Sequence, residues 1–257
     1  MKTPIYAGAA VAGLVAILAG YAPAAETTSG TRVPVLLELF TSEGCSSCPP
    51  ADRLLETFDR TQPFAKADLI VLSEHVDYWD RLGWKDPCSS PQFSARQQEY
   101  ADRFSRDGVY TPQLVVDGRF ELVGSDQRSA SSAIQKAAGE RKIPIVVSNV
   151  VRKESQITTS IEVRGQNENA KGVLYVAVAS DRAESHVARG ENAGRSLAHV
   201  AVARVLKQVR TVGLAKASTR EVTLTIPPGV DVNASRLVVF IQDARSAHVL
   251  GVAERRI

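Results

Sequence analysis

Two cysteines separated by two serines, Cys45 and Cys48, constrain the fold of this chain more than any other feature. The apolar run at residues 33–40 precedes them and has the length and flanks of a buried strand. Apolar side chains then recur at helical spacing across residues 51–58, which predicts an amphipathic helix. A C-x-x-C turn between a strand and a helix is typical of a redox-active dithiol.

The position of the pair also predicts its chemistry. Cys45 would lie near the helix N-terminus, where free N–H groups and the helix dipole favour an anion and lower a thiol pKa. The thiolate is the attacking species in thiol–disulfide exchange. Cys48 lies one turn further along and could resolve a mixed disulfide. Pro49 suits a first helical turn, which does not need its missing N–H.

Structural zinc is the rival explanation for two closely spaced cysteines. Such a site needs a second pair of ligands. The chain has only one other cysteine, Cys88, and its four histidines show no H-x3-H spacing. The composition therefore favours redox chemistry over a zinc finger.

The N-terminus predicts export. Lys2 provides a positive start, residues 6–20 are apolar, and Ala22-Pro-Ala24 offers an A-x-A cleavage site. We interpret residues 1–24 as a signal peptide cleaved near Ala24, in preference to an uncleaved anchor. The mature protein would be periplasmic or secreted, with no stable insertion in the membrane. In an oxidising compartment, an isolated dithiol is either a structural disulfide or a redox catalyst.

The length and the net charge of the chain limit the number of domains and the kinds of partner that we expect. A chain of 257 residues predicts two domains. The formal net charge is +3, and basic residues form no run longer than a pair. A nucleic-acid partner is therefore not expected, because such proteins gather basic residues on one face.

The first half of the chain alternates strands and helices. Residues 68–76 predict a second buried strand, so strand, helix and strand form a parallel βαβ unit. Ser90-Pro91 predicts the start of another helix. Asp117-Gly118 predicts a hairpin turn, and Ser125-Asp126 caps a last helix.

The second half has a different pattern, with short strands and no convincing helix. The predicted strands are residues 143–151, 156–163, 172–179, 199–209, 220–226, 236–243 and 247–253. Seven such strands predict an antiparallel sandwich. We therefore expect an α/β thioredoxin-like domain at residues 31–140, followed by an all-β antiparallel sandwich domain at residues 143–257.

Two resemblances support the first domain. Its strand–C-x-x-C–helix pattern resembles the thioredoxin-fold oxidoreductases, which place a cis-proline opposite the dithiol. Segment 111–118 is similar to that loop, which implies that Pro112 is cis and that Thr111 pairs with a substrate backbone. Segments 38–52, 75–80, 90–97 and 110–113 resemble a family of secreted bacterial proteins catalogued as domain of unknown function 1223.

That family resemblance spans residues 33–257, is most specific at the dithiol and implies no established reaction. Members of the family tend to carry an aromatic residue at the position of Cys88, which makes the third thiol a feature of this chain. We expect Cys88 in an exposed loop, where it is a third redox thiol, an intermolecular link or an unused small side chain.

Several other residues are candidates for the site. Glu38 interrupts an apolar strand and could shuttle the proton of the resolving cysteine, or pair with an arginine. Trp79 and Tyr110 are candidates for substrate binding beside Thr111, although aromatic residues such as Trp79 equally suit a core. The polar segment that includes His186, Arg189, Glu191, Asn192 and Arg195 is expected to be a solvated loop.

Three functions remain open from the sequence. The first is a thiol–disulfide oxidoreductase without a cofactor, in which Cys45, Cys48, Pro112 and Glu38 act on a protein or small-molecule thiol or disulfide. The second is a copper- or zinc-binding protein that uses Cys45 and Cys48 with His75 or Cys88. His75 could instead simply anchor the loop that follows it. The third is a scaffold with a structural disulfide.

Overall fold

The computed structural model describes Met1, residues 32–165 and residues 171–257. The predicted signal peptide, residues 1–24, lies outside the described residues. Thr31–Ile257 forms one compact unit. Among the residues that the structure describes, no helix is both long and apolar enough to cross a membrane.

Eleven strands and three α-helices make up the described part of this unit. The strands are β1 (Val33–Thr41), β2 (Ala67–His75), β3 (Gln113–Val116), β4 (Phe120–Val123), β5 (Ile145–Lys153), β6 (Gln156–Arg164), β7 (Lys171–His186), β8 (Ser196–Gly213), β9 (Ala217–Thr225), β10 (Ser235–Asp243) and β11 (Val249–Arg256). The helices are α1 (Pro49–Thr61), α2 (Pro91–Arg103) and α3 (Gln127–Ala137), with short 3-10 turns η1 (Asp80–Leu82) and η2 (Val232–Ala234).

The local elements of the first half follow the sequence. β1 and β2 pair in parallel around α1, and β3 and β4 form an antiparallel hairpin through a turn at Asp117 and Gly118, both with positive φ. Ser90 caps α2 by accepting a hydrogen bond from the Gln92 N–H. Asp126 caps α3 in the same way through the Ser129 N–H.

The predicted fold class, an α/β thioredoxin-like domain followed by an all-β antiparallel sandwich, is wrong. All seven predicted strands exist, but β7, β8, β10 and β11 extend the sheet of the first half. The result is one mixed eight-stranded sheet in the order β11-β10-β7-β8-β2-β1-β3-β4. The junction is a parallel contact between β2 and β8, with Ser73 opposite Val202. The fold is therefore mostly β.

The remaining strands form a second sheet in the order β5-β6-β9. Its buried side chains share a core with β7 and β10, so two sheets pack face to face there. The physical reason for the error is that alternation along a strand shows which face is buried, but not which neighbour the strand pairs with.

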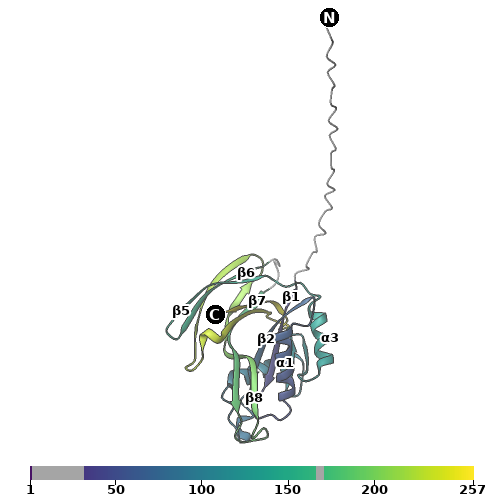
Figure 1. Cartoon of the computed structure of the whole chain (residues 1–257), viewed down its shortest axis with the longest axis vertical. Helices are drawn as coiled ribbons and strands as arrows, with labels where there is room; N and C mark the ends of the chain where they lie inside the picture. The colour runs from purple at the N-terminus through teal and green to yellow at the C-terminus, as the bar shows by residue number, and fades with distance from the viewer. Residues whose placement is uncertain (2–31, 166–170) are drawn as a thin grey trace. The chain divides into compact units, whose positions relative to one another are not determined.

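The helices lie on both faces of the large sheet. Leu39 and Thr41 of β1 face α1, and the Thr41 hydroxyl donates to Asp52 of that helix over 2.9 Å. Glu38 and Phe40 point to the opposite face, where α2 packs. In Figure 1, α1 lies against the β2 region of the sheet, while β5 and β6 lie on the other side of the unit.

Candidate functional site

A disulfide joins Cys45 and Cys48 in the turn between β1 and α1. Cys48 is the N-cap residue of α1, and Pro49 and Pro50 begin the helix. Both cysteines are fully buried, whereas the two intervening serines are exposed. The pair therefore lies at the positive end of a helix dipole, as the sequence predicts, but beneath the protein surface.

The loop between β7 and β8, residues 187–195, contacts the backbone of the dithiol turn, and we call it the cover loop. Asn192 is fully buried in it, and its side-chain amide donates to the Glu43 carbonyl over 2.8 Å and the Cys45 carbonyl over 2.9 Å. The Arg195 guanidinium donates to the Asn192 side-chain oxygen over 3.0 Å. The prediction of a solvated loop is therefore wrong for Asn192.

Two further contacts hold the cover loop. The Glu191 carboxylate accepts a hydrogen bond from the Ser46 N–H over 3.1 Å. Gly190 has φ +78° and lies so close to Trp84 that an added Cβ would meet the Trp84 Cβ at 3.4 Å. The cover loop is thus fastened to the dithiol turn and also to the segment around Trp84.

Between Glu43 and Asp52, which flank the two cysteines in the chain, β8 contributes the buried imidazole of His199. Its Nε2 lies 3.6 Å from a Glu43 carboxylate oxygen, and its Nδ1 lies 3.6 Å from one of Asp52. Burial alone would lower the pKa of His199, but these two carboxylates raise it to about 10. His199 is therefore an imidazolium ion at neutral pH, held between two acids.

Glu43 connects His199 to Trp84 and to the end of β7, which precedes the cover loop. Its carboxylate accepts hydrogen bonds from the Trp84 indole N–H over 2.7 Å and the Ser185 hydroxyl over 2.6 Å. Burial opposes ionisation, but His199 and these donors outweigh it and lower the pKa of Glu43. Glu43 thus stays a carboxylate, two residues before Cys45 in the chain.

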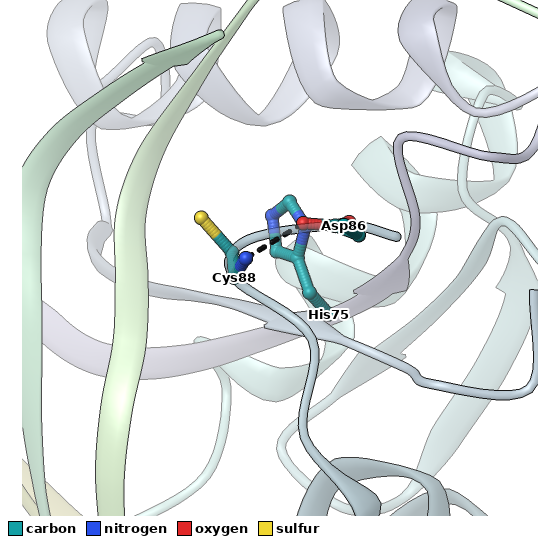
Figure 2. Close-up of side chains that lie close together, drawn as sticks. All are labelled: His75, Asp86 and Cys88. Atoms are coloured by element: carbon teal, nitrogen blue, oxygen red, sulfur yellow. Dashed lines mark hydrogen bonds and ion pairs between the residues drawn. The ribbon is translucent and has the colours of Figure 1, made fainter. Parts of the chain in front are cut away.

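A second buried group adjoins the first and consists of His75, Asp86 and Cys88 (Figure 2). His75 Nδ1 lies 2.7 Å from Asp86 Oδ2, and the His75 and His199 rings meet edge to face at 4.5 Å. Asp86 also accepts hydrogen bonds from the Glu43 and Cys88 N–H groups. Burial opposes ionisation of Asp86, but His75 and these N–H donors lower its pKa to about 2.

Cys88 is buried rather than exposed, with 8% of its surface accessible. Burial raises the pKa of its thiol to about 12, even though the Arg204 guanidinium donates a hydrogen bond to its sulfur over 3.3 Å. His75 lies at the end of β2, at the same edge of the sheet as the dithiol turn, and there it holds the loop through Asp86.

The Thr111–Pro112 peptide bond is cis, as the sequence predicts. A Cβ added to Gly124 would meet Pro112 Cβ at 3.2 Å and Ala51 Cβ, in the first turn of α1, at 3.1 Å. Pro112 therefore packs near the helix end that carries the disulfide. Trp79 joins the same region: its indole donates to the Thr111 hydroxyl over 2.8 Å, and its Cβ lies against Gly44.

Glu38 and Tyr110 are engaged elsewhere. Glu38 is fully buried on the α2 face, where its carboxylate accepts from Arg96 Nε over 2.6 Å and from the Tyr100 hydroxyl over 2.5 Å. The arginine pairing expected as an alternative for Glu38 is the arrangement observed. The Tyr110 hydroxyl donates to Glu121 on β4 over 2.6 Å, and its carbonyl accepts from Gln97.

The structure thus brings together Cys45, Cys48, Thr111, Pro112 and Trp79, and separately His75 and Cys88. The sequence did not single out Glu43, Asp52, Asp86 or His199 as site residues, and it placed Asn192 in a solvated loop. Two of these have a local signal: Asp52 follows Cys48 by one helical turn, and His199 interrupts the apolar run of β8.

The described residues define a protein with a mostly β, two-sheet fold, a covered disulfide at a helix N-terminus and a buried polar cluster beside it. The model of a family described as "Protein of unknown function (DUF1223)" matches residues 36–242. The chain belongs to this family, as the sequence resemblance implies.

Two solved structures are similar to this chain to different extents. The chain is similar to a crystal structure of protein AGR_C_4864 from Agrobacterium tumefaciens, with 26% identity, a TM-score of 0.67, and coverage of 87% of this chain and 94% of that chain. A domain of the outer membrane lipoprotein Omp28 from Porphyromonas gingivalis is 18% identical, with a TM-score of 0.31 and coverage of 46% and 88%. No curated protein matches this chain.

Proposed function

We propose that the protein is a thiol–disulfide oxidoreductase that acts on protein or small-molecule thiols and disulfides. The observation that carries this proposal is the Cys45–Cys48 disulfide at the N-terminus of α1. In the reduced form, the free N–H groups of the helix would stabilise a Cys45 thiolate. The cis Pro112 and Thr111, next to the same helix end, offer a backbone edge for an extended substrate.

The exchange follows from the two sulfurs. In the oxidising direction, a substrate thiolate attacks Cys45, a substrate–Cys45 bond forms, and Cys48 leaves as a thiolate that takes up a proton. A second substrate thiolate then attacks the substrate sulfur, which releases Cys45 as a thiolate. The substrate loses two electrons and becomes a disulfide, and the protein gains them as a dithiol. The reverse order reduces a substrate disulfide.

Cys48 takes up a proton in the oxidising direction and must lose one in the reducing direction, so a buried group near Cys48 has to exchange that proton. Asp52 lies four residues after Cys48 on α1, so the two side chains share one face of the helix. Asp52 contacts His199 and accepts from Thr41, which keeps its carboxylate fixed. We assign Asp52 the proton-transfer role that the sequence gives to Glu38, because the Glu38 carboxylate is bound to Arg96.

The cover loop adds a step to this mechanism. Both cysteines are fully buried, so no substrate sulfur reaches Cys45 until residues 187–195 move away from the dithiol turn. The cover loop can move only when the two Asn192 hydrogen bonds and the hydrogen bond between Glu191 and Ser46 break. Exchange is therefore limited by loop opening when the substrate is abundant.

Burial of both sulfurs favours a second candidate, a non-catalytic scaffold with a structural disulfide. Trapping a substrate separates the two candidates. With Cys48→Ser, the remaining Cys45 thiol should form a mixed disulfide with a thiol-reactive probe or a periplasmic protein, and Cys45→Ser should not. Cys88→Ser is the matched control, and it should leave trapping unchanged. An inert Cys45 in the Cys48→Ser variant would support the scaffold.

The compartment is part of the same proposal. The signal-like features of residues 1–24 support export to the periplasm or beyond, where disulfide exchange has partners. The reaction requires no cofactor.

A further inference from the structure

The imidazole of His75 is buried with one nitrogen lacking a partner. Its side chain is fully inaccessible, and Nε2 makes no hydrogen bond to any residue that the structure describes. Nδ1 faces the Asp86 carboxylate at 2.7 Å, so in the neutral ring Nδ1 carries the proton and Nε2 has the lone pair that a metal would use. Buried polar atoms are nearly always paired, so an unpaired imidazole nitrogen points to a missing ligand.

Cys88 supplies a second donor at the same place. One ligand atom from each of His75, Asp86 and Cys88 lies within 4.8 Å of the others. In Figure 2, Asp86 lies on one side of the imidazole ring and the Cys88 sulfur on the other, where Nε2 is. The thiol and the free nitrogen therefore face a common space.

Asp86 orients the site and does not coordinate. Its Oδ2 is engaged by His75 Nδ1 and the Glu43 N–H, and its Oδ1 accepts from the Cys88 N–H. A carboxylate behind a histidine is the usual support of a metal-bound imidazole, because it fixes the tautomer and the ring orientation. The same carboxylate fixes the backbone of Cys88.

We propose that His75 Nε2 and Cys88 Sγ bind one Cu(I) ion. A thiolate and an imidazole are soft to intermediate donors that suit Cu(I), and two donors satisfy its low coordination number. Zn(II) fits this site poorly, because its structural sites use four ligands in a tetrahedron. The Arg204 guanidinium, 3.3 Å from the sulfur, stabilises the thiolate that remains when Cu(I) replaces the thiol proton.

The acidic side chains near His75 and Cys88 can balance the charge of a bound cation. The carboxylates of Glu43 and Asp86 lie within this network, with Asp52 beyond His199, and they offset the positive charges of Arg204 and His199. Of the two ligands, Cys88 alone retains some exposure, at 8%, so the ion enters from its side. The donors do not include Cys45 or Cys48, so this site is independent of the proposed exchange reaction.

An anaerobic titration tests the site. The mature-length chain, with the Cys45–Cys48 disulfide intact, is titrated with Cu(I) against a chromogenic Cu(I) chelator. We expect one ion per chain, sulfur and nitrogen scattering at low coordination number in X-ray absorption, and no displacement by equimolar Zn(II). Cys88→Ser and His75→Gln should each weaken binding at least 100-fold.

The controls separate this site from the dithiol. A Cys45→Ser, Cys48→Ser double variant should bind Cu(I) as the wild type does, and thermal unfolding checks that every variant is folded. The proposal is overturned if folded Cys88→Ser keeps wild-type affinity, if binding is lost only with Cys45 and Cys48, or if the wild type binds no Cu(I). None of these results bears on whether Cys45 exchanges disulfides.

Discussion

The side chain of Asn192 donates a hydrogen bond to the backbone carbonyl of Cys45 over 2.9 Å, across a sequence separation of 147 residues. The same amide reaches the Glu43 carbonyl, so one buried side chain fastens the cover loop to the dithiol turn. The dithiol turn is therefore held in place by a residue of the β7–β8 loop, far from the cysteines in the chain.

Asn192→Ala should expose the dithiol. Removing the amide leaves two buried carbonyl groups unpaired, and a lost buried hydrogen bond costs about 1–3 kcal/mol. Much of that cost falls on the covered state, so reduction of the disulfide by dithiothreitol should accelerate about 5- to 100-fold. Quenched alkylation followed by mass spectrometry measures the rate. Asn233→Ala, at an exposed position of η2, is the control and should reduce at the wild-type rate.

Replacing the buried carboxylates of Asp52 and Glu38 by amides should have two different effects on the protein. Asp52→Asn should slow exchange by about 100-fold, because general acid–base groups contribute at least that much. Glu38→Gln should leave the exchange rate unchanged but lower the free energy of unfolding by about 1.5–3 kcal/mol, since it removes the closer of the two carboxylates beside buried Arg96, with Glu74 3.6 Å from Nε. Stopped-flow exchange and urea unfolding provide the two measurements. A slower exchange in Glu38→Gln than in Asp52→Asn would reverse the assignment.

The His199 ion pairs predict a pH dependence of stability. The pKa of His199 is about 10 in the folded protein and 6.5 when unperturbed. Because the folded state holds the proton more tightly, this stabilisation is complete below pH 6.5 and is lost as the pH rises to 10. Urea unfolding of the metal-free protein from pH 6 to 10 should show that decline. In His199→Gln the decline should be smaller, and identical slopes would refute the ion pairs.

Export predicts a defined mature N-terminus. If residues 1–24 are a cleaved signal peptide, protein recovered from the periplasm of an expressing bacterium should begin at Ala25. Intact mass spectrometry of that fraction is the measurement. Protein that carries residues 1–24 and stays with the membrane would indicate an uncleaved anchor instead.

Much of the local structure could be predicted from the sequence. Periodicity located the strands and helices, because the burial of one face leaves a period of 2 or 3.6 residues in the chain. The caps at Ser90 and Asp126 and the turn at Asp117-Gly118 carry residue types that those conformations require. The cis bond before Pro112 was predicted from the resemblance of segment 111–118 to the thioredoxin-fold oxidoreductases, and the structure has it.

The assembly of the elements could not be predicted in the same way. No pattern within β8 indicates that it pairs with β2, so the continuous sheet was missed. The same missing information hid the site. His199 lies on β8 and contacts Glu43 and Asp52, and Asn192 lies on the loop before β8 and contacts the Cys45 carbonyl, and the continuous sheet brings both to this region. His199 within a buried run of β8 and Asp52 one helical turn after Cys48 are the two sequence features that signal these partners.

The central claim is that Cys45 and Cys48 form a reactive, gated dithiol. The most direct measurement is the reduction potential of their disulfide, by equilibration with glutathione and dithiothreitol buffers, together with the alkylation pH profile of Cys45 in the reduced protein. We predict a potential above about −300 mV and a Cys45 pKa below that of a free cysteine. A potential below about −300 mV with an unreactive Cys45 would contradict the claim and identify a structural disulfide.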